Sequence, residues 1–420
     1  MKHYLQNPTS KAFLLSNLIC CPFFGVFALL PMILCKELQA SSLQISTMTA
    51  IKPLTALFAS YWSSLHFRKS HYSSLKWGYL LKFLPFVFLP FLSNTWAFVF
   101  AFGIHMLLLR GVIPSWMETL KRNLSHDDCG KVCSIGSSVN YLCTAFLPIL
   151  FGWVLDAVEE SWRWAILSTS ILGMGSVWLI VKYLKKPLEN PKTSLPHRKA
   201  SLLSRPWKNA HVLLSKRPDF FHFQVGFFLG GAGLMVMHAI IPKYFTETLQ
   251  LSYTQMFLGV CFCKGIGFSL SSPIWVKIFN RSEIFSFCSI VPLVAVIFPL
   301  FLILAKLNGV FLFFAYFLYG IMQSGSELGW KMSGPIFAKE QDSSAFSSIN
   351  ILAVGVRGAI FPYLGALLFL FGGPYTAFAC GALFCLFGSI YLWKIRRIYA
   401  VYTKSINNQA YTSRVSKLGF

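Results

Sequence analysis

The sequence predicts an all-α membrane protein with twelve transmembrane helices, arranged as two pseudo-symmetric bundles of six. Three observations support this prediction. Apolar segments long enough to cross a bilayer recur along the chain, a basic polar stretch divides them into two equal sets, and the two sets share a motif pattern. Of the 420 residues, 55% are hydrophobic and only 12% are charged, about half the charged fraction of a soluble globular chain. Such a composition fits a lipid solvent.

The first half of the chain holds six apolar segments with short connections. The first, residues 12–35, is too long for the apolar core of a signal peptide and lacks a small-residue cleavage site, so we interpret it as a membrane span. In lipid, only a helix satisfies the backbone polar groups of such a segment, at roughly 20 residues per crossing. The predicted spans are residues 12–35, 43–65, 75–92, 96–117, 134–156 and 162–183.

A polar stretch, residues 182–219, separates the two halves. It carries ten Lys or Arg residues, and Glu189 is its only acid before Asp219. Six further apolar segments follow it, at residues 220–241, 254–277, 284–305, 309–330, 347–371 and 375–393. We therefore predict an N-terminal six-helix bundle (1–183), a basic cytoplasmic linker (184–218), a C-terminal six-helix bundle (219–395) and a cytoplasmic tail (396–420).

The positive charges predict the orientation of the chain in the membrane. Cytoplasmic connections carry an excess of Lys and Arg. With the N-terminus inside, the outer connections hold only Lys36, Arg163, Lys243 and Lys306, whereas the inner ones hold the linker and most other cations. We expect a multi-pass protein of the cell (inner) membrane with both termini cytoplasmic. The same rule explains the net charge of +23 without a nucleic-acid partner.

The two halves resemble copies of one unit. Four pairs of motifs recur at offsets of 210 to 214 residues, each in matching spans. Internal duplication of a six-span unit is typical of secondary transporters, which bind their solute where the repeats meet. The pairs are Trp62-x5-Arg68 with Trp275-x5-Arg281, the Ser-Ser-Val/Ile-Asn runs ending at Asn140 and Asn350, Pro148 with Pro362, and Trp116 with Trp330.

With these features the chain resembles the major facilitator superfamily over nearly its whole length. Trp162-Arg163-Trp164 is similar to the family's Trp-Arg-Trp at the start of span 6, and Arg110 to the family arginine of span 4. Pro148 and Gly152 match part of the family's Gly-Pro-x-x-Gly-Gly motif, while Cys143, Leu147 and Phe151 replace glycines of this motif, which is associated with exchangers and drug exporters.

The resemblance implies alternating access, in which the halves rock about a central site. The family's loop motif between spans 2 and 3 is reduced here to Arg68 and Lys69, with Arg281 in the second half. The resemblance places a cytoplasmic gate at the corners after spans 2 and 8. Its residues would be Trp62, Arg68, Lys69, Trp275 and Arg281.

Four cations inside the spans are the candidate substrate-binding residues: Lys52, Lys264, Arg110 and Arg357. A charge at mid-bilayer costs at least about 2.5–3.5 kcal/mol on insertion scales, so it indicates a function. Lys52 and Lys264 precede their repeated tryptophans by 10 and 11 residues, so each half contributes one lysine toward a shared cavity. Arg binds carboxylate or phosphate with bidentate geometry and Lys with a point charge, which predicts a small organic anion as solute.

Fewer residues qualify for proton coupling. Glu327 is the only carboxylate well inside a span, and it either carries a coupling proton or pairs with Arg357 or Arg110. His105 and His238 titrate in the right range, but a lone intramembrane His is more often structural. Lys82 lies close enough to the inner end of its span to extend its ammonium group to the interface.

Other function classes fit the sequence less well. The sequence lacks the HExxH and GxSxG motifs that would indicate a metalloprotease or a serine hydrolase, so we do not expect an enzyme. Its eleven cysteines form no CxxC pair, and we expect neither a cofactor nor a metal. Two alternatives stay open: a drug or metabolite exporter of the same superfamily, and a non-transporting membrane receptor or sensor. The expected partners are the bilayer and a small solute, with a coupling proton left open, in a monomeric protein.

Overall fold

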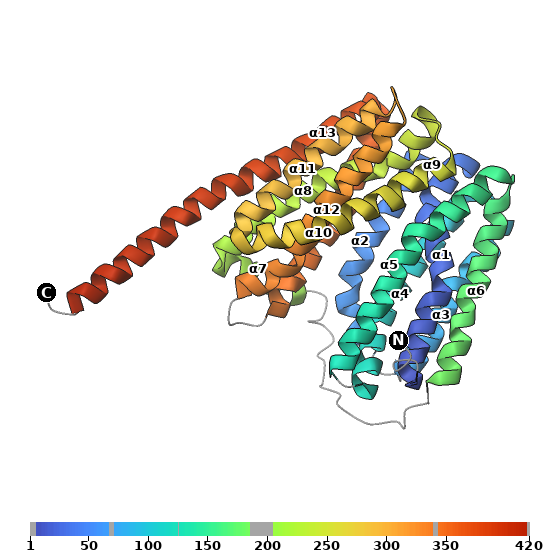
Figure 1. Ribbon diagram of the computed structural model, residues 1–420, viewed down its shortest axis with the longest axis horizontal. Coiled ribbons are helices and arrows are strands. Elements are labelled where there is room, and N and C mark those ends of the chain that lie inside the picture. The colour runs from blue at the N-terminus through green and yellow to red at the C-terminus, as the bar shows by residue number, and fades with distance from the viewer. Residues whose placement is uncertain (1–5, 67–70, 125, 185–204, 339–342, 418–420) are drawn as a thin grey trace.

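The computed structural model describes residues 6–66, 71–124, 126–184, 205–338 and 343–417, and helices dominate these residues (Figure 1). The first half of the chain forms six long helices and one short 3-10 turn, η2 (Leu89–Phe91). Each helix contains one of the six predicted spans of this half. The exception is the end of the third span, residues 89–92, which lies in η2 and directly after it. The helices are α1 (Pro8–Leu38), α2 (Ser42–His66), α3 (His71–Phe88), α4 (Thr95–Asn123), α5 (His126–Ala157) and α6 (Ser161–Tyr183).

The described part of the second half begins with α7 (Arg205–Lys216), a short amphipathic helix, and continues with helices and π-turns that cover nearly all residues of the other predicted spans. Two π-helical turns interrupt the helices in the described part of this half. The elements are α8 (Pro218–Lys243), η4 (Tyr244–Thr248), α9 (Tyr253–Phe257), η5 (Leu258–Cys263), α10 (Lys264–Arg281), α11 (Ile284–Leu304), α12 (Val310–Ala338) and α13 (Ser343–Lys417). Helix α13 is divided at Gly373, whose φ of 75° lies in the left-handed region that glycine adopts without strain.

Seven helices of the described part of the chain are long and apolar enough to cross a membrane: residues 8–38, 95–117, 161–183, 218–248, 253–281, 284–304 and 346–398. The last stretch has 53 residues, enough for two crossings at roughly 20 residues each. Helix α12 falls outside this set, and Gln323, Ser324, Ser326 and Glu327 make its second half more polar. The protein is therefore a multi-pass membrane protein.

Figure 1 shows two groups of helices, α1–α6 and α8–α13, that converge at one end and separate toward the other. Helix α6 ends and α7 begins at the separated end, which we call the linker-proximal end; the opposite one is the linker-distal end. Helix α2 packs along α13, and α5 packs along α9 and η5. These two pairs of helices join the halves.

Close packing holds the α2–α13 pair together. Gly355 faces Leu57, and Gly358 faces Pro53, so that a side chain at either glycine would collide with α2. Toward the linker-distal end, the Tyr363 hydroxyl donates a hydrogen bond of 3.4 Å to the Thr47 hydroxyl. The pair fixes the middle of α2, and with it Lys52, beside the second half.

Candidate functional site

Three of the four candidate cations are linked by electrostatic interaction, with Lys52 as the common member. Lys52 on α2 interacts electrostatically with Arg110 on α4 and with Lys264 on α10. Lys52 is exposed, and Arg110 and Lys264 are half-buried. Lys52 thus has one cationic neighbour in its own half and another in the opposite half.

The backbone around Lys264 is held by close helix packing. Gly267 on α10 lies against the Phe317 carbonyl of α12, and Gly320 on α12 lies against the Lys264 carbonyl. A Cβ atom at either glycine would collide with the facing backbone. Lys264 also directly follows the π-helical turn η5, and π-turns within helices are frequent at functional sites. The glycine contacts therefore fix the α10 backbone at Lys264 against α12.

His238 belongs to the same cluster. Its ring interacts electrostatically with both Lys264 and Lys52, and its Nε2 atom shares a hydrogen bond of 2.9 Å with the Tyr319 hydroxyl of α12. The His238 and Tyr319 rings meet edge to face, with centroids 5.2 Å apart. Tyr319 is not among the site residues that the sequence predicts. Its hydroxyl in an otherwise apolar run of α12 is the signal that points to it.

Arg357 has different surroundings. It is buried, its Nη1 atom donates a hydrogen bond of 3.1 Å to the Phe227 carbonyl, and its guanidinium lies against Gly231 of α8. Its Nε atom is buried without a hydrogen-bond partner. These contacts direct Arg357 toward α8 and fasten α13 to it.

Glu327 pairs with neither of the arginines that the sequence suggested. Its carboxylate accepts a hydrogen bond of 2.6 Å from Lys331, one turn further along α12. The Glu327 side chain is 28% exposed and that of Lys331 is 61% exposed, so this is an i,i+4 pair on an open helix surface. Such pairs contribute only about 0.3–0.5 kcal/mol.

His105 lies in an aromatic cluster inside the first half. Its ring is fully buried, and its Nδ1 atom donates a hydrogen bond of 3.0 Å to the Lys82 carbonyl. The predicted extension of Lys82 to the membrane interface is wrong. Its side chain is 1% exposed, and its ammonium group lies 3.5 Å from the Tyr79 ring centroid and 4.7 Å from that of Phe83. Aromatic faces attract the cation here.

The candidate gate residues are only partly described. Arg68 and Lys69 lie outside the described residues, as does the side chain of Trp62. Trp275 is buried, donates a hydrogen bond of 2.7 Å to the Ile321 carbonyl and contacts Phe287 edge to face. Arg281 is exposed at the end of α10. Trp275 thus joins α10, α11 and α12 within the second half.

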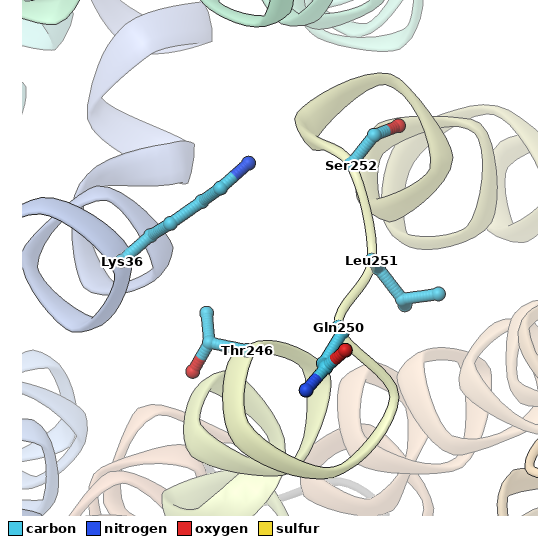
Figure 2. Close-up of a pocket in the computed structure, with 5 residues that line it drawn as sticks. All are labelled: Lys36, Thr246, Gln250, Leu251 and Ser252. Carbon is cyan, nitrogen blue, oxygen red and sulfur yellow. The ribbon is translucent and has the colours of Figure 1, made fainter.

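A cavity of about 300 Å³ lies at the linker-distal end, away from the cationic cluster. Figure 2 shows Lys36 of α1 extending toward the chain between η4 and α9. Lys36, Thr246, Gln250, Leu251 and Ser252 line this cavity. It is therefore formed by residues of both halves.

The cationic cluster concentrates hydrogen-bond donors and positive charge from both halves. Two of its members are lysines, whose ammonium groups each offer three hydrogen-bond donors, and Arg110 adds a planar fork of five. Glu327, the carboxylate that the sequence placed within a span, is bound to Lys331. Among the described residues, no group of His, Cys, Asp or Glu is arranged to hold a metal ion.

Several solved structures of membrane transporters have a fold similar to that of this chain. A crystal structure of the nucleoside transporter NupG has a TM-score of 0.69 at 10% identity, covering 93% of this chain and 99% of that one. A transporter of the POT family, in complex with 5-aminolevulinic acid, has a TM-score of 0.70 at 12% identity and covers 94% and 96% of the two chains. A bacterial homologue of the human lysosomal transporter Spinster, inward-facing and unoccupied, has a TM-score of 0.66 at 11% identity, with 94% and 98% covered.

The sequence comparisons give the family. No curated protein matches the sequence. The profile of the Major Facilitator Superfamily matches residues 12–333, which include the first half of the chain and most of the second. This match, together with the two groups of membrane helices and the transporter folds that resemble them, shows that the chain belongs to the Major Facilitator Superfamily.

Proposed function

We propose that this protein is a secondary transporter of a small organic anion, a phosphate- or carboxylate-bearing metabolite, which it moves by alternating access. The observation that carries the proposal is the cluster of Lys52, Arg110 and Lys264, because both halves contribute cations to it. A neutral or cationic solute would leave these charges uncompensated at mid-membrane, where uncompensated charge is costly.

The charges also suggest how binding drives the cycle. Lys52 and Lys264 belong to opposite halves and repel each other. A bound anion cancels this repulsion, so the halves close more readily around an occupied site than around an empty one. This difference couples solute binding to the rocking of the halves and favours exchange of one anion for another.

The remaining candidate residues have supporting roles in this proposal. Tyr319 orients His238 beside the lysines, and Arg357 fastens α13 to α8. Glu327 is paired with Lys331 and not with a cation of the cluster. We propose that the linker-proximal end faces the cytoplasm, because α6 ends and α7 begins there and the sequence that connects them is basic. We also propose that the two halves move as separate bodies, and that the protein works as a monomer in the cell membrane.

Counterflow in lipid vesicles tests the substrate class. The purified protein is reconstituted with unlabelled solute inside, and uptake of labelled solute is measured for phosphates, carboxylates, neutral nucleosides and organic cations of similar size. We expect counterflow of at least one anion, and its loss in Lys52→Gln and Lys264→Gln. Lys182→Gln is the matched control, because Lys182 packs on Trp178 at the linker-proximal end of α6. Counterflow of neutral or cationic solutes alone would refute the proposal.

A further inference from the structure

The closed linker-distal end has an unusual hydrogen-bonding arrangement. The carboxylate of Asp156, at the end of α5 in the first half, accepts hydrogen bonds from two backbone N–H groups at the start of α9 in the second half. Tyr253 N lies 2.8 Å from Oδ1, and Thr254 N lies 2.8 Å from Oδ2. Both oxygens of one carboxylate thus bind the opposite half through main-chain N–H groups. Among substitutions in α9, only one to proline would remove such a group.

Two residues from the end of α1 extend this contact. Lys36 Nζ lies 3.8 Å from Asp156 Oδ1 and 4.1 Å from the centroid of the Tyr253 ring. The Tyr253 hydroxyl donates a hydrogen bond of 2.8 Å to Glu37. In Figure 2, Lys36 extends across the cavity toward Ser252, which directly precedes Tyr253. Four side chains from both halves therefore form one polar network at this end.

The helices α5 and α9 lie unusually close beside this network. Gly152, one turn before Asp156, faces the Phe257 ring and the Thr254 backbone, and a Cβ atom at Gly152 would lie 3.1 Å from Thr254 Cα. Because glycine has no side chain, α5 can approach α9 closely enough for the Asp156 carboxylate to bind both amides. A single turn of α5 thus holds α9 by packing and by charge.

The segment from Tyr253 to Arg281 therefore contacts both halves: its start is bound to the first half, and its later part is packed against the second. Its first part, α9, is bound by Asp156 of the first half. Its later part, α10, is packed backbone to backbone against α12 of the second half, through Gly267 and Gly320. The π-helical turn η5 lies between the two. A π-helical turn has rare i→i+5 hydrogen bonding, and helices kink at such turns. The segment therefore changes direction most readily at η5.

We infer that Asp156 is a positioning residue that closes the linker-distal gate, and that η5 is the hinge at which α9 moves when the gate opens. In the closed state Asp156 holds α9 against the first half. When its two hydrogen bonds break, α9 moves away with the second half, while α10 keeps Lys264 fixed to α12. The inference rests on the alternating-access part of the proposed function and does not depend on the charge of the solute.

Hydrogen–deuterium exchange of the full-length protein in lipid nanodiscs tests this role. Removing Asp156 frees two amides from a charged acceptor, so Asp156→Ala is expected to raise exchange in residues 249–263 about tenfold. Because the gates alternate, exchange at the linker-proximal ends of α4, α8 and α10 is expected to fall. Asp156→Glu, which keeps both acceptor oxygens, is expected to lie between Asp156→Ala and the unmodified protein.

Glu160→Ala is the matched control, because Glu160 lies at the same end, is 70% exposed and pairs only weakly, at 3.6 Å, with Arg163 of its own half. This control is expected to exchange like the unmodified protein. Unchanged exchange of residues 249–263 in Asp156→Ala would overturn the inference. So would faster exchange at both ends, which marks general destabilisation. Reciprocal exchange without anion counterflow would support the gate and reject the anionic substrate.

Discussion

Lys52 on α2 and Lys264 on α10 interact electrostatically across the boundary between the two halves of the protein. They follow the same internal repeat, so each half of the chain contributes one of the two like charges. Two facing ammonium groups repel each other unless an anion lies between them. The proposed transport of anions follows from this relationship.

Substitution of Tyr319 by Phe tests the role of the His238 partner. Removing the hydroxyl eliminates the 2.9 Å hydrogen bond that orients His238, and a bond of this kind contributes about 1 kcal/mol. We expect KM for the transported anion to rise roughly fivefold with little change in the maximum rate. The matched control is Tyr391→Phe, which removes a hydroxyl bound to His222 at the start of α8. An equal rise in both variants would show that the effect is not specific to the site.

Substitution of Glu327 by Gln separates anion exchange from proton coupling. The carboxylate pairs with Lys331 on an open face of α12, and losing such a pair costs about 0.3–0.5 kcal/mol. We therefore expect counterflow and its pH profile to stay within about twofold of the unmodified protein. The measurement is counterflow between pH 5.5 and 8.5. Loss of proton-driven uptake with counterflow intact would instead assign Glu327 to proton coupling.

Substitution of Gly231 by Ala tests the packing of Arg357. A Cβ atom at this position would collide with the guanidinium that is hydrogen-bonded to the Phe227 carbonyl. Overpacking of this kind typically costs about 1–3 kcal/mol of unfolding free energy, so we expect a lower melting temperature in detergent. Gly175→Ala on α6 is the control, because nothing lies within 4 Å of its Cβ position. Equal melting temperatures of the two variants would contradict the described packing.

Substitution of Lys82 by Met tests whether the buried lysine serves transport. Lys82 is enclosed by Tyr79, Phe83 and Phe24. Replacing a buried charge by an apolar side chain of similar size is often neutral or stabilising by about 1–4 kcal/mol, and the lost cation–π contacts offset about 2 kcal/mol of that. We expect full counterflow and an unchanged or higher melting temperature. A folded variant without counterflow would assign Lys82 to the transport cycle.

The helices follow from the sequence because long apolar segments in lipid have one way to satisfy their backbone. The described helices and π-turns cover nearly all residues of the predicted spans. Hydropathy cannot show how a helix is hydrogen-bonded, so the π-turns η4 and η5 and the division of α13 at Gly373 were not predicted. These features depend on local backbone geometry and on neighbouring helices.

The partners of polar residues are harder to predict than their presence. The sequence identifies Glu327, Arg357 and Lys82 as charges within or near the membrane, but the direction of a side chain depends on helix rotation. Glu327 binds a neighbour on its own helix, Arg357 packs on α8, and Lys82 lies among aromatic rings. The capping of α9 by Asp156 joins residues of opposite halves, and no local pattern reveals it.

Binding of the anion identified by counterflow, measured by titration calorimetry on the purified protein, tests the central claim most directly. Each lysine forms a charge-assisted contact worth about 1.5–3 kcal/mol, so Lys52→Gln and Lys264→Gln are each expected to weaken binding roughly 10- to 100-fold. We expect no measurable binding in the double variant, and unchanged binding in Lys182→Gln. A double variant that binds the anion as tightly as the unmodified protein would contradict the account.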